Sequence, residues 1–224
     1  MIKETIYSKR SSLLRKNDSR VLSMEIIFNK FQDVFILNGN SFLIEENSNQ
    51  VLTIRPENYY SVINNGDSPI EIQYSQDVSQ HKIIYDPYKY ELSKKIKLQS
   101  EFFVENYNIP KSYTDTLPKW YSFKFTYPDY NLIFVRPEMG ISIQTHEHRN
   151  EYWEILEGNP IIITGNKVHY FVENGTKFKN QRNSFHSVIN PNKEADKFVM
   201  LKERWDGKFD EKDISRVFNP NHYR

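Results

Sequence analysis

The sequence predicts an all-β protein, because its apolar residues fall in short runs that turn-forming residues interrupt. Over residues 24–74, runs rich in valine, isoleucine, phenylalanine and tyrosine are separated by segments such as Asn38-Gly39-Asn40 and Asn64-Asn65-Gly66-Asp67. Short strands at this spacing are typical of an antiparallel β domain. The same pattern returns after residue 118, so a second β domain is expected there.

An internal repeat supports two similar β halves. Residues 36–44 (ILNGNSFLI) resemble residues 155–163 (ILEGNPIII), and residues 60–64 (YSVIN) resemble residues 186–190 (HSVIN). Counting back from the matched glycines sets three residues, Ile27, Asn29 and Gln32, opposite His146, His148 and Glu151. Tyr60 then stands in the place of His186, so we expect the first half to lack a metal set.

We divide the chain into a first β domain over residues 1–79, a connecting segment over 80–117 and a second β domain over 118–224. In the connector, apolar residues from Leu92 to Phe103 follow an imperfect helical pattern, which predicts a short helix. Pro118 disfavours helical backbone at the residue before it and marks the break to the second half.

Composition excludes several classes of function. The 224 residues contain no cysteine, which is compatible with a reducing cytoplasm, and no apolar run long enough to span a membrane. Thirty basic against twenty-nine acidic residues give no general attraction to nucleic acid or to anionic membranes. We therefore expect a cytoplasmic protein with a small-molecule partner, and the formation of a homodimer stays open.

Candidate metal ligands are concentrated between Gly140 and Gly158. His146 and His148 stand two apart, so on a strand both imidazoles would project from one face. We interpret Arg149-Asn150 as a short turn, after which Glu151 returns a carboxylate to the histidines.

Two further residues complete the candidate set. His186 begins a second short apolar run and would close the site, and Gln144 has the same parity as the two earlier histidines. Imidazoles with a carboxylate suit one divalent transition metal, which could be Zn, Fe, Mn, Co or Ni. Glu151 has an alternative role in orienting a ligand, and Gln144 an alternative role in filling the barrel. We interpret Trp153 as a core residue, and His81, His169 and His222 as ordinary surface or core histidines.

These residues resemble the two motifs of the cupin superfamily. The first motif, G-x5-H-x-H-x3,4-E-x6-G, is matched by Gly140, His146, His148, Glu151 and Gly158, with a shortened spacing before the glutamate. The second, G-x5-P-x-G-x2-H-x3-N, is matched by Gly175, His186 and Asn190. The resemblance implies a double-stranded β-helix (jelly-roll) cupin, and the repeat implies a bicupin with a degenerate N-terminal half.

Within the cupins, residues 118–224 are most similar to type II mannose-6-phosphate isomerases, the domain also fused to mannose-1-phosphate guanylyltransferases. The family run S-L-Q-x-H-x-H-R-x-E-H-W is mirrored by residues 142–153 (SIQTHEHRNEYW), and its E-D-D-I-x-R signature by residues 211–216 (EKDISR). The family usually has a basic pair on the preceding strand and a basic residue after the second-motif histidine. Here those positions hold Asn131-Leu132-Ile133 and Ser187.

The resemblance implies interconversion of mannose 6-phosphate and fructose 6-phosphate through a cis-enediol. The metal would act as a Lewis acid, and Arg149 would recognise phosphate or a hydroxyl group. Glu151 could be the base only if it does not bind the metal. The alternatives are a cupin enzyme acting on another sugar phosphate or nucleotide sugar, and a non-catalytic sugar-binding module.

Overall fold

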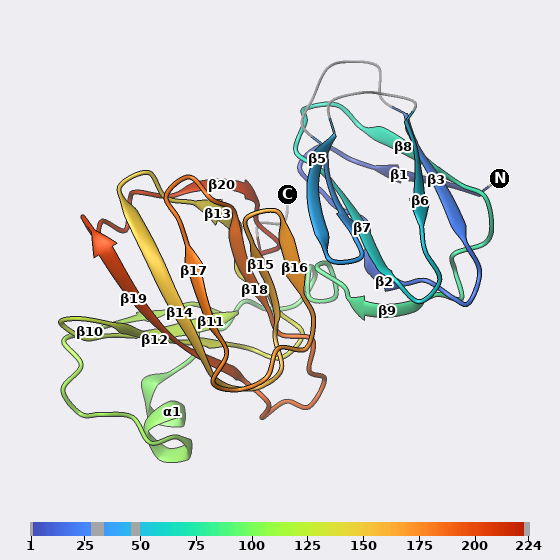
Figure 1. The fold of residues 1–224 in the computed structure, drawn as a ribbon. Coiled ribbons are helices and arrows are strands. Elements are labelled where there is room, and N and C mark those ends of the chain that lie inside the picture. The colour runs from blue at the N-terminus through green and yellow to red at the C-terminus, as the bar shows by residue number, and fades with distance from the viewer. Residues whose placement is uncertain (1, 28–33, 46–49, 222–224) are drawn as a thin grey trace. The chain divides into compact units, whose positions relative to one another are not determined.

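The computed structural model describes residues 2–27, 34–45 and 50–221, and these consist almost entirely of strands and loops (Figure 1). The chain forms two compact units. The first comprises Met1–Pro87 with Asn166–Val168, and the second comprises Tyr88–Gly165 with His169–Arg224. Among the described residues, no helix is both long and apolar enough to cross a membrane.

The first unit contains two antiparallel sheets. Its strands are β1 (Ile2–Ile6), β2 (Leu14–Lys16), β3 (Leu22–Ile27), β4 (Val34–Asn38), β5 (Ser41–Glu45), β6 (Gln50–Ile54), β7 (Tyr59–Asn64), β8 (Ile70–Tyr74) and β9 (Lys82–Tyr85). One sheet has the order β1-β8-β3-β6, and the other runs β5-β4-β7-β2-β9. The side chains that the two sheets direct toward each other form an apolar core. Strand β3, for example, contributes every second residue to it.

The second unit also contains two antiparallel sheets. Its elements are α1 (Ser100–Asn106), β10 (Asp115–Pro118), β11 (Ser122–Thr126), β12 (Asn131–Val135), β13 (Ile143–Thr145), β14 (Arg149–Glu157), β15 (Ile161–Thr164), β16 (Lys167–His169), β17 (Lys177–Asn180), β18 (His186–Ile189), β19 (Val199–Gly207) and β20 (Ser215–Phe218). Strand β16 continues the strand order of this unit, although its first two residues are grouped with the first unit. One sheet has the order β10-β11-β12-β19-β14-β17, and the other begins β20-β13-β18-β15-β16.

The two units repeat one strand order. Strands β1 to β8 alternate between their two sheets as β1-β8-β3-β6 and β2-β7-β4-β5, and strands β12 to β19 do so as β12-β19-β14-β17 and β13-β18-β15-β16. This is the eight-stranded jelly-roll arrangement, in which consecutive strands alternate between facing sheets except at one central hairpin, here β4–β5 in the first unit and β15–β16 in the second. The expected all-β jelly-roll fold is therefore confirmed.

The expected alignment of Gly39 with Gly158 is wrong. Gly39 turns β4 into β5, whereas Gly158 lies between β14 and β15, so the two glycines join different strands of the repeated order.

The counterpart of Gly39 is Gly165, which turns β15 into β16. Both glycines have positive φ, 57° and 59°, and both precede an asparagine. Each lies 21 residues before its matched partner, Tyr60 or His186. The positions set opposite His146, His148 and Glu151 therefore do not correspond, and two of them, Asn29 and Gln32, lie outside the described residues.

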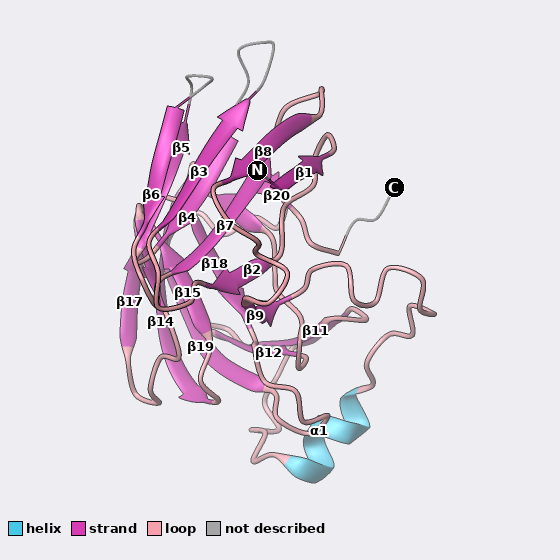
Figure 2. Cartoon of the chain, turned by 90° about the vertical axis from the view of Figure 1, so that its right-hand side faces the viewer, coloured by secondary structure: helices cyan, strands magenta, loops and turns pink. Residues whose placement is uncertain are grey.

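The helix expected in the connecting segment forms at Ser100–Asn106 (Figure 2). It packs with the second unit, because Phe103 is fully buried against Phe123 and Phe134, with ring centroids 4.9 and 4.5 Å away. Aromatic contacts of this kind fix the position of a short helix whose intrinsic stability is low.

Candidate functional site

The structure brings together three of the expected ligands inside the second jelly roll. His146 directly follows β13, Glu151 lies on β14 and His186 begins β18. The Nε2 atom of His146 is 3.1 Å from Glu151 Oε1, and Nε2 of His186 is 3.5 Å from Glu151 Oε2. One potential ligand atom from each residue lies within 4.8 Å of the others, and all three side chains are buried. One sheet supplies the two histidines and the other supplies the glutamate, so the cluster lies in the interior between the two sheets.

Hydrogen bonds on the far side of each ring orient the two imidazoles. His186 Nδ1 is 2.9 Å from the carbonyl oxygen of Ser184, and His146 Nδ1 contacts the carbonyl oxygen of Asp213. A carbonyl oxygen can only accept, so Nδ1 carries the proton and Nε2 presents a lone pair to the cluster. Burial lowers the pKa of His186, which keeps this ring neutral at neutral pH.

The donor set fits a divalent transition metal. Nε2 of His186 is buried without a hydrogen-bond partner in the described part of the chain, although it points toward the Glu151 carboxylate. An unpaired buried nitrogen is costly unless it binds something. Two imidazoles and one carboxylate are ligands that zinc and similar ions prefer.

Gln144 lies beside the cluster but does not yet present its oxygen. It pairs with His186 in the β13–β18 ladder, and its Oε1 accepts a hydrogen bond of 2.7 Å from Ser142 Oγ. The amide nitrogen is 3.4 Å from His146 Nε2. A half-turn of the amide group would exchange these two atoms and offer Oε1 as a fourth ligand.

His148 is not part of the cluster. The expectation that His146 and His148 share one strand face is wrong, because β13 ends at Thr145 and the chain bends at residues 147–148. The carboxylate of Asp213 holds this bend by accepting hydrogen bonds from the backbone N–H groups of Glu147 and His148. The side chain of His148 is consequently exposed.

The expected turn at Arg149-Asn150 is also replaced, because β14 already begins at Arg149. Arg149 is therefore an inward residue, like Glu151 two positions later, and only 5% of its surface is exposed. Its Nε donates to Glu151 Oε1 at 2.8 Å, and its Nη2 is 2.9 Å from His146 Nε2. The guanidinium group thus uses the lone pair of His146 that a metal ion would need.

The other side of the guanidinium group is held by the loop that follows β19. Arg149 Nη1 donates to the carbonyl oxygens of Asp210 and Asp213, at 3.0 and 3.2 Å. The ring of Phe209 lies 5.0 Å from the guanidinium carbon. Arg149 therefore ties this loop to the cluster, and its donors are already engaged by the protein.

A second buried carboxyl group, Glu203 on β19, lies close to Glu151. Trp153 Nε1 is 3.2 Å from an oxygen of each glutamate, and Asn131 Nδ2 donates to Glu203 Oε1 at 2.8 Å. Trp153 itself is a core residue, as the sequence predicted. Sequence reasoning missed Glu203, although its parity with the apolar residues Val199 and Leu201 marks it as an inward residue of β19.

The two glutamates have opposite protonation at neutral pH. Burial and the negative charge of Glu151 raise the pKa of Glu203 to about 8. Burial raises the pKa of Glu151, but its contacts with His146 and His186 and the positive charge of Arg149 outweigh this effect and lower that pKa to about 2. Glu151 is thus a carboxylate, while Glu203 holds a proton that it can exchange near neutral pH.

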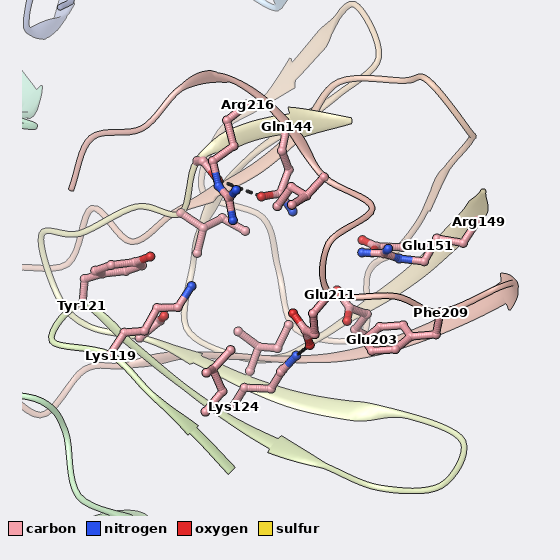
Figure 3. A pocket seen from close by; sticks show the side chains of 16 residues that line it. Lys119, Tyr121, Lys124, Gln144, Arg149, Glu151, Glu203, Phe209, Glu211 and Arg216 are labelled. Carbon is pink, nitrogen blue, oxygen red and sulfur yellow. Dashed lines mark hydrogen bonds and ion pairs between the residues drawn. The ribbon is translucent and has the colours of Figure 1, made fainter. Parts of the chain in front are cut away.

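A pocket that is open to solvent leads to these groups (Figure 3). The lining comprises Leu117, Lys119, Tyr121, Ser122, Lys124, Ile133, Ile141, Ser142, Gln144, Arg149, Glu151, Glu203, Phe209, Glu211, Ile214 and Arg216. All of these residues belong to the second unit. The pocket gives a small molecule access to the buried acids and their neighbours.

Comparisons with known proteins agree with the sequence resemblance. Residues 122–219, somewhat less than half of the chain, match the family described as "Mannose-6-phosphate isomerase C-terminal". A search of curated proteins gave no match. The family match confirms that the second half resembles the type II isomerases, and the matched segment includes every candidate metal ligand.

Three solved structures are similar at low identity. A sugar phosphate isomerase of the cupin superfamily from Silicibacter pomeroyi is 13% identical, with 39% of this chain and 60% of that chain covered and a TM-score of 0.33. Oxalate decarboxylase from Lactobacillus farciminis is 8% identical, with coverages of 96% and 78% and a TM-score of 0.38. Salicylate 1,2-dioxygenase from Pseudaminobacter salicylatoxidans is 8% identical, with coverages of 90% and 69% and a TM-score of 0.31. At these identities and TM-scores, they add nothing to the assignment of chemistry.

Proposed function

We propose that the protein is a metal-dependent sugar-phosphate isomerase, with interconversion of mannose 6-phosphate and fructose 6-phosphate as its leading reaction. The observation that carries this proposal is the buried cluster of His146, Glu151 and His186 beside an open pocket. It lies within the segment that matches the isomerase family. The substrate class follows from that family match, and the metal site follows from the orientation of the imidazoles.

We assign the metal to His146, Glu151 and His186, with Gln144 as a fourth ligand. When bound, a divalent transition metal supplies a Lewis acid that stabilises negative charge on the oxygens of the sugar. Arg149 must release its hydrogen bond to His146 Nε2 before that nitrogen can bind the ion. Its bonds to the carbonyl oxygens of Asp210 and Asp213 can persist, so the loop after β19 stays in place.

Aldose–ketose isomerisation also requires a base that carries a proton between two adjacent carbons. We assign this role to Glu203, because it lines the pocket next to Glu151 and has no part in the metal set. Its raised pKa of about 8 suits a group that must both accept and return a proton near neutral pH. Glu151 is less suited to the role, because it is assigned to the metal and is already in contact with His146 and Arg149.

The first unit is proposed to be a degenerate cupin, over residues 1–79, that contributes no metal ligand. Its strand β3 directs Leu22, Met24 and Ile26 into an apolar core, where β14 directs Arg149 and Glu151 into the site. The boundaries 80–117 for the connector and 118–224 for the metal-binding domain belong to the same proposal. A ratio of about one metal ion per chain is expected.

A non-catalytic sugar-binding module is the second candidate. It is favoured by one observation, the hydrogen bond between Arg149 Nη2 and His146 Nε2, which competes with metal binding. A cupin enzyme acting on another sugar phosphate or a nucleotide sugar would use the same pocket and differ in substrate. Turnover separates these candidates.

The test is an isomerisation assay on metal-loaded protein with a panel of hexose phosphates and nucleotide sugars. We expect mannose 6-phosphate to be converted to fructose 6-phosphate, and His186→Ala to be inactive. Turnover of another sugar alone would change the substrate assignment. If no sugar is converted but one binds, the binding module replaces the isomerase.

A further inference from the structure

We infer that Lys119 and Arg216 form a phosphate subsite in the pocket, across the hollow from Glu151. The inference rests on the proposed function, because it names the part of the site that would take the phosphate group of a sugar phosphate. Figure 3 shows the Lys119 and Arg216 side chains directed into the hollow from two different sides, with Arg149 and Glu151 on a third.

The two cations come from distant parts of the sequence. Lys119 follows β10, and its Nζ lies 5.5 Å from the ring centroid of Tyr121. Arg216 lies on β20, opposite Gln144 in the β13–β20 ladder. The sheet therefore places the backbone of Arg216 beside that of a metal-ligand candidate, while its head group reaches the pocket.

The charges of Lys119 and Arg216 are not balanced within the protein. Neither side chain forms an ion pair with a carboxylate in the described part of the chain, although both line a pocket. By contrast, Lys124 pairs with Glu211. Arg149 is bonded to Glu151 and to two backbone carbonyl oxygens. Two uncompensated cations at one hollow favour an anionic group of a ligand.

A phosphate monoester is the anion that this pair fits best. It carries close to two negative charges and three acceptor oxygens at neutral pH, which match one ammonium and one guanidinium group. The positions that are usually basic in the related isomerases cannot contribute. Asn131 is buried and bonded to Glu203, and Ser187 is buried and bonded to the carbonyl oxygen of Ile141. The cations that remain for a phosphate group are therefore Arg216 on β20 and Lys119 in the β10–β11 connection.

The first experiment measures binding without turnover. Isothermal titration of the metal-free protein compares mannose 6-phosphate with mannose, for the wild type and for Lys119→Gln and Arg216→Gln. We expect each variant to weaken binding of mannose 6-phosphate about tenfold or more and to leave the affinity for mannose unchanged. Lys111→Gln and Lys193→Gln, at exposed positions outside the pocket, serve as matched controls and should bind like the wild type.

A variant of opposite sign keeps the test independent of misfolding. Glu211→Gln removes the partner of Lys124, which lines the same pocket, and so adds an unbalanced cation to it. We expect tighter binding of mannose 6-phosphate by a few-fold, with the gain decreasing as salt rises. A gain that is equal for mannose would contradict the subsite.

The two proposals can fail separately. If the protein converts no sugar but Lys119→Gln and Arg216→Gln lose phosphate-dependent affinity, the isomerase is rejected and the subsite stands. If mannose 6-phosphate is converted and both variants keep the wild-type KM and affinity, the subsite is rejected and the isomerase stands.

Discussion

The two jelly rolls share one strand order but differ in what their strands direct inward. In the first, β3 buries Leu22, Met24 and Ile26, and the interior is an apolar cluster. In the second, β14 buries Arg149 and Glu151 before it returns to apolar residues. A few inward positions thus convert a packed core into a candidate site, while the strand order that holds them stays the same.

Tyr60 and His186 occupy equivalent positions in the two units, and they show the same difference. Tyr60 is fully buried and its hydroxyl group is 2.8 Å from Nδ1 of His81, so its polar atom is satisfied within the first unit. Nε2 of His186 is equally buried but has no hydrogen-bond partner among the residues that the structure describes. Repeated sequence around these residues therefore preserves the strand but not its chemistry.

The largest expected effect is on metal content, which should depend on ligands in the second unit and not on the equivalent residue in the first. His146→Ala and His186→Ala each remove a nitrogen ligand, so we expect metal content to fall from about one ion per chain to near zero. Tyr60→Phe is the matched change in the first unit and should leave metal content unchanged. Elemental analysis of purified, dialysed protein measures this, and equal metal in all four proteins would refute the site.

Catalysis should depend on the second unit through Glu203. Glu203→Gln keeps the shape of the side chain but removes its exchangeable acid, so we expect kcat to fall by roughly 10²–10⁴ while KM and metal content stay near wild type. Exchange of solvent deuterium into the sugar should fall in parallel with turnover. A variant that keeps the wild-type kcat would show that another group carries the proton.

The short strands and turns of both units could be largely predicted from sequence, because alternating apolar residues and turn signals are local properties, and the jelly-roll fold followed from the resemblance to the cupins. The error at Gly158 arose because ILEG resembles ILNG by letter, whereas Gly39-Asn40 and Gly165-Asn166 make the equivalent turns. Three residues in or near the candidate site could not be placed from local pattern, namely His148, Arg149 and Glu203. His148 is turned outward by hydrogen bonds from its segment to Asp213, which is 65 residues away.

Arg149 was expected to recognise the substrate because it follows the histidine pair. The structure gives it contacts with Asp210 and Asp213 on the loop after β19. Glu203 was missed because it becomes a candidate functional residue only through its position beside Glu151, which lies on the neighbouring strand. Both cases require knowledge of which strands pair, and motif spacing does not contain this information.

A smaller effect concerns how stability depends on pH. The pKa of Glu203 is about 8 in the folded protein against 4.5 as its ordinary value, so the folded state holds this proton more tightly than the unfolded state. Its contribution is fully present below pH 4.5 and is lost as the pH rises through 8. The loss is at most about 5 kcal/mol.

Denaturant titrations of metal-free wild type and Glu203→Gln between pH 5 and 9 measure this contribution. We expect the wild type to lose stability relative to the variant as the pH rises toward 8, and the difference to level off above it. His186 acts in the other direction, because its lowered pKa costs stability as the pH falls below 6.5, but it is present in both proteins and cancels. A difference that does not vary with pH would mean that Glu203 has an ordinary pKa.

The smallest expected effect separates the two histidines of the second unit. The His148 side chain is exposed, and its segment is held through backbone N–H groups that an alanine would keep. His148→Ala should therefore retain close to the wild-type metal content and change the free energy of unfolding by less than about 0.5 kcal/mol. His146→Ala is the control, because it is two residues away and removes a ligand. If His148→Ala loses the metal as well, then the bend at residues 147–148 must open when the ion binds. His148, rather than Gln144, would then complete the set.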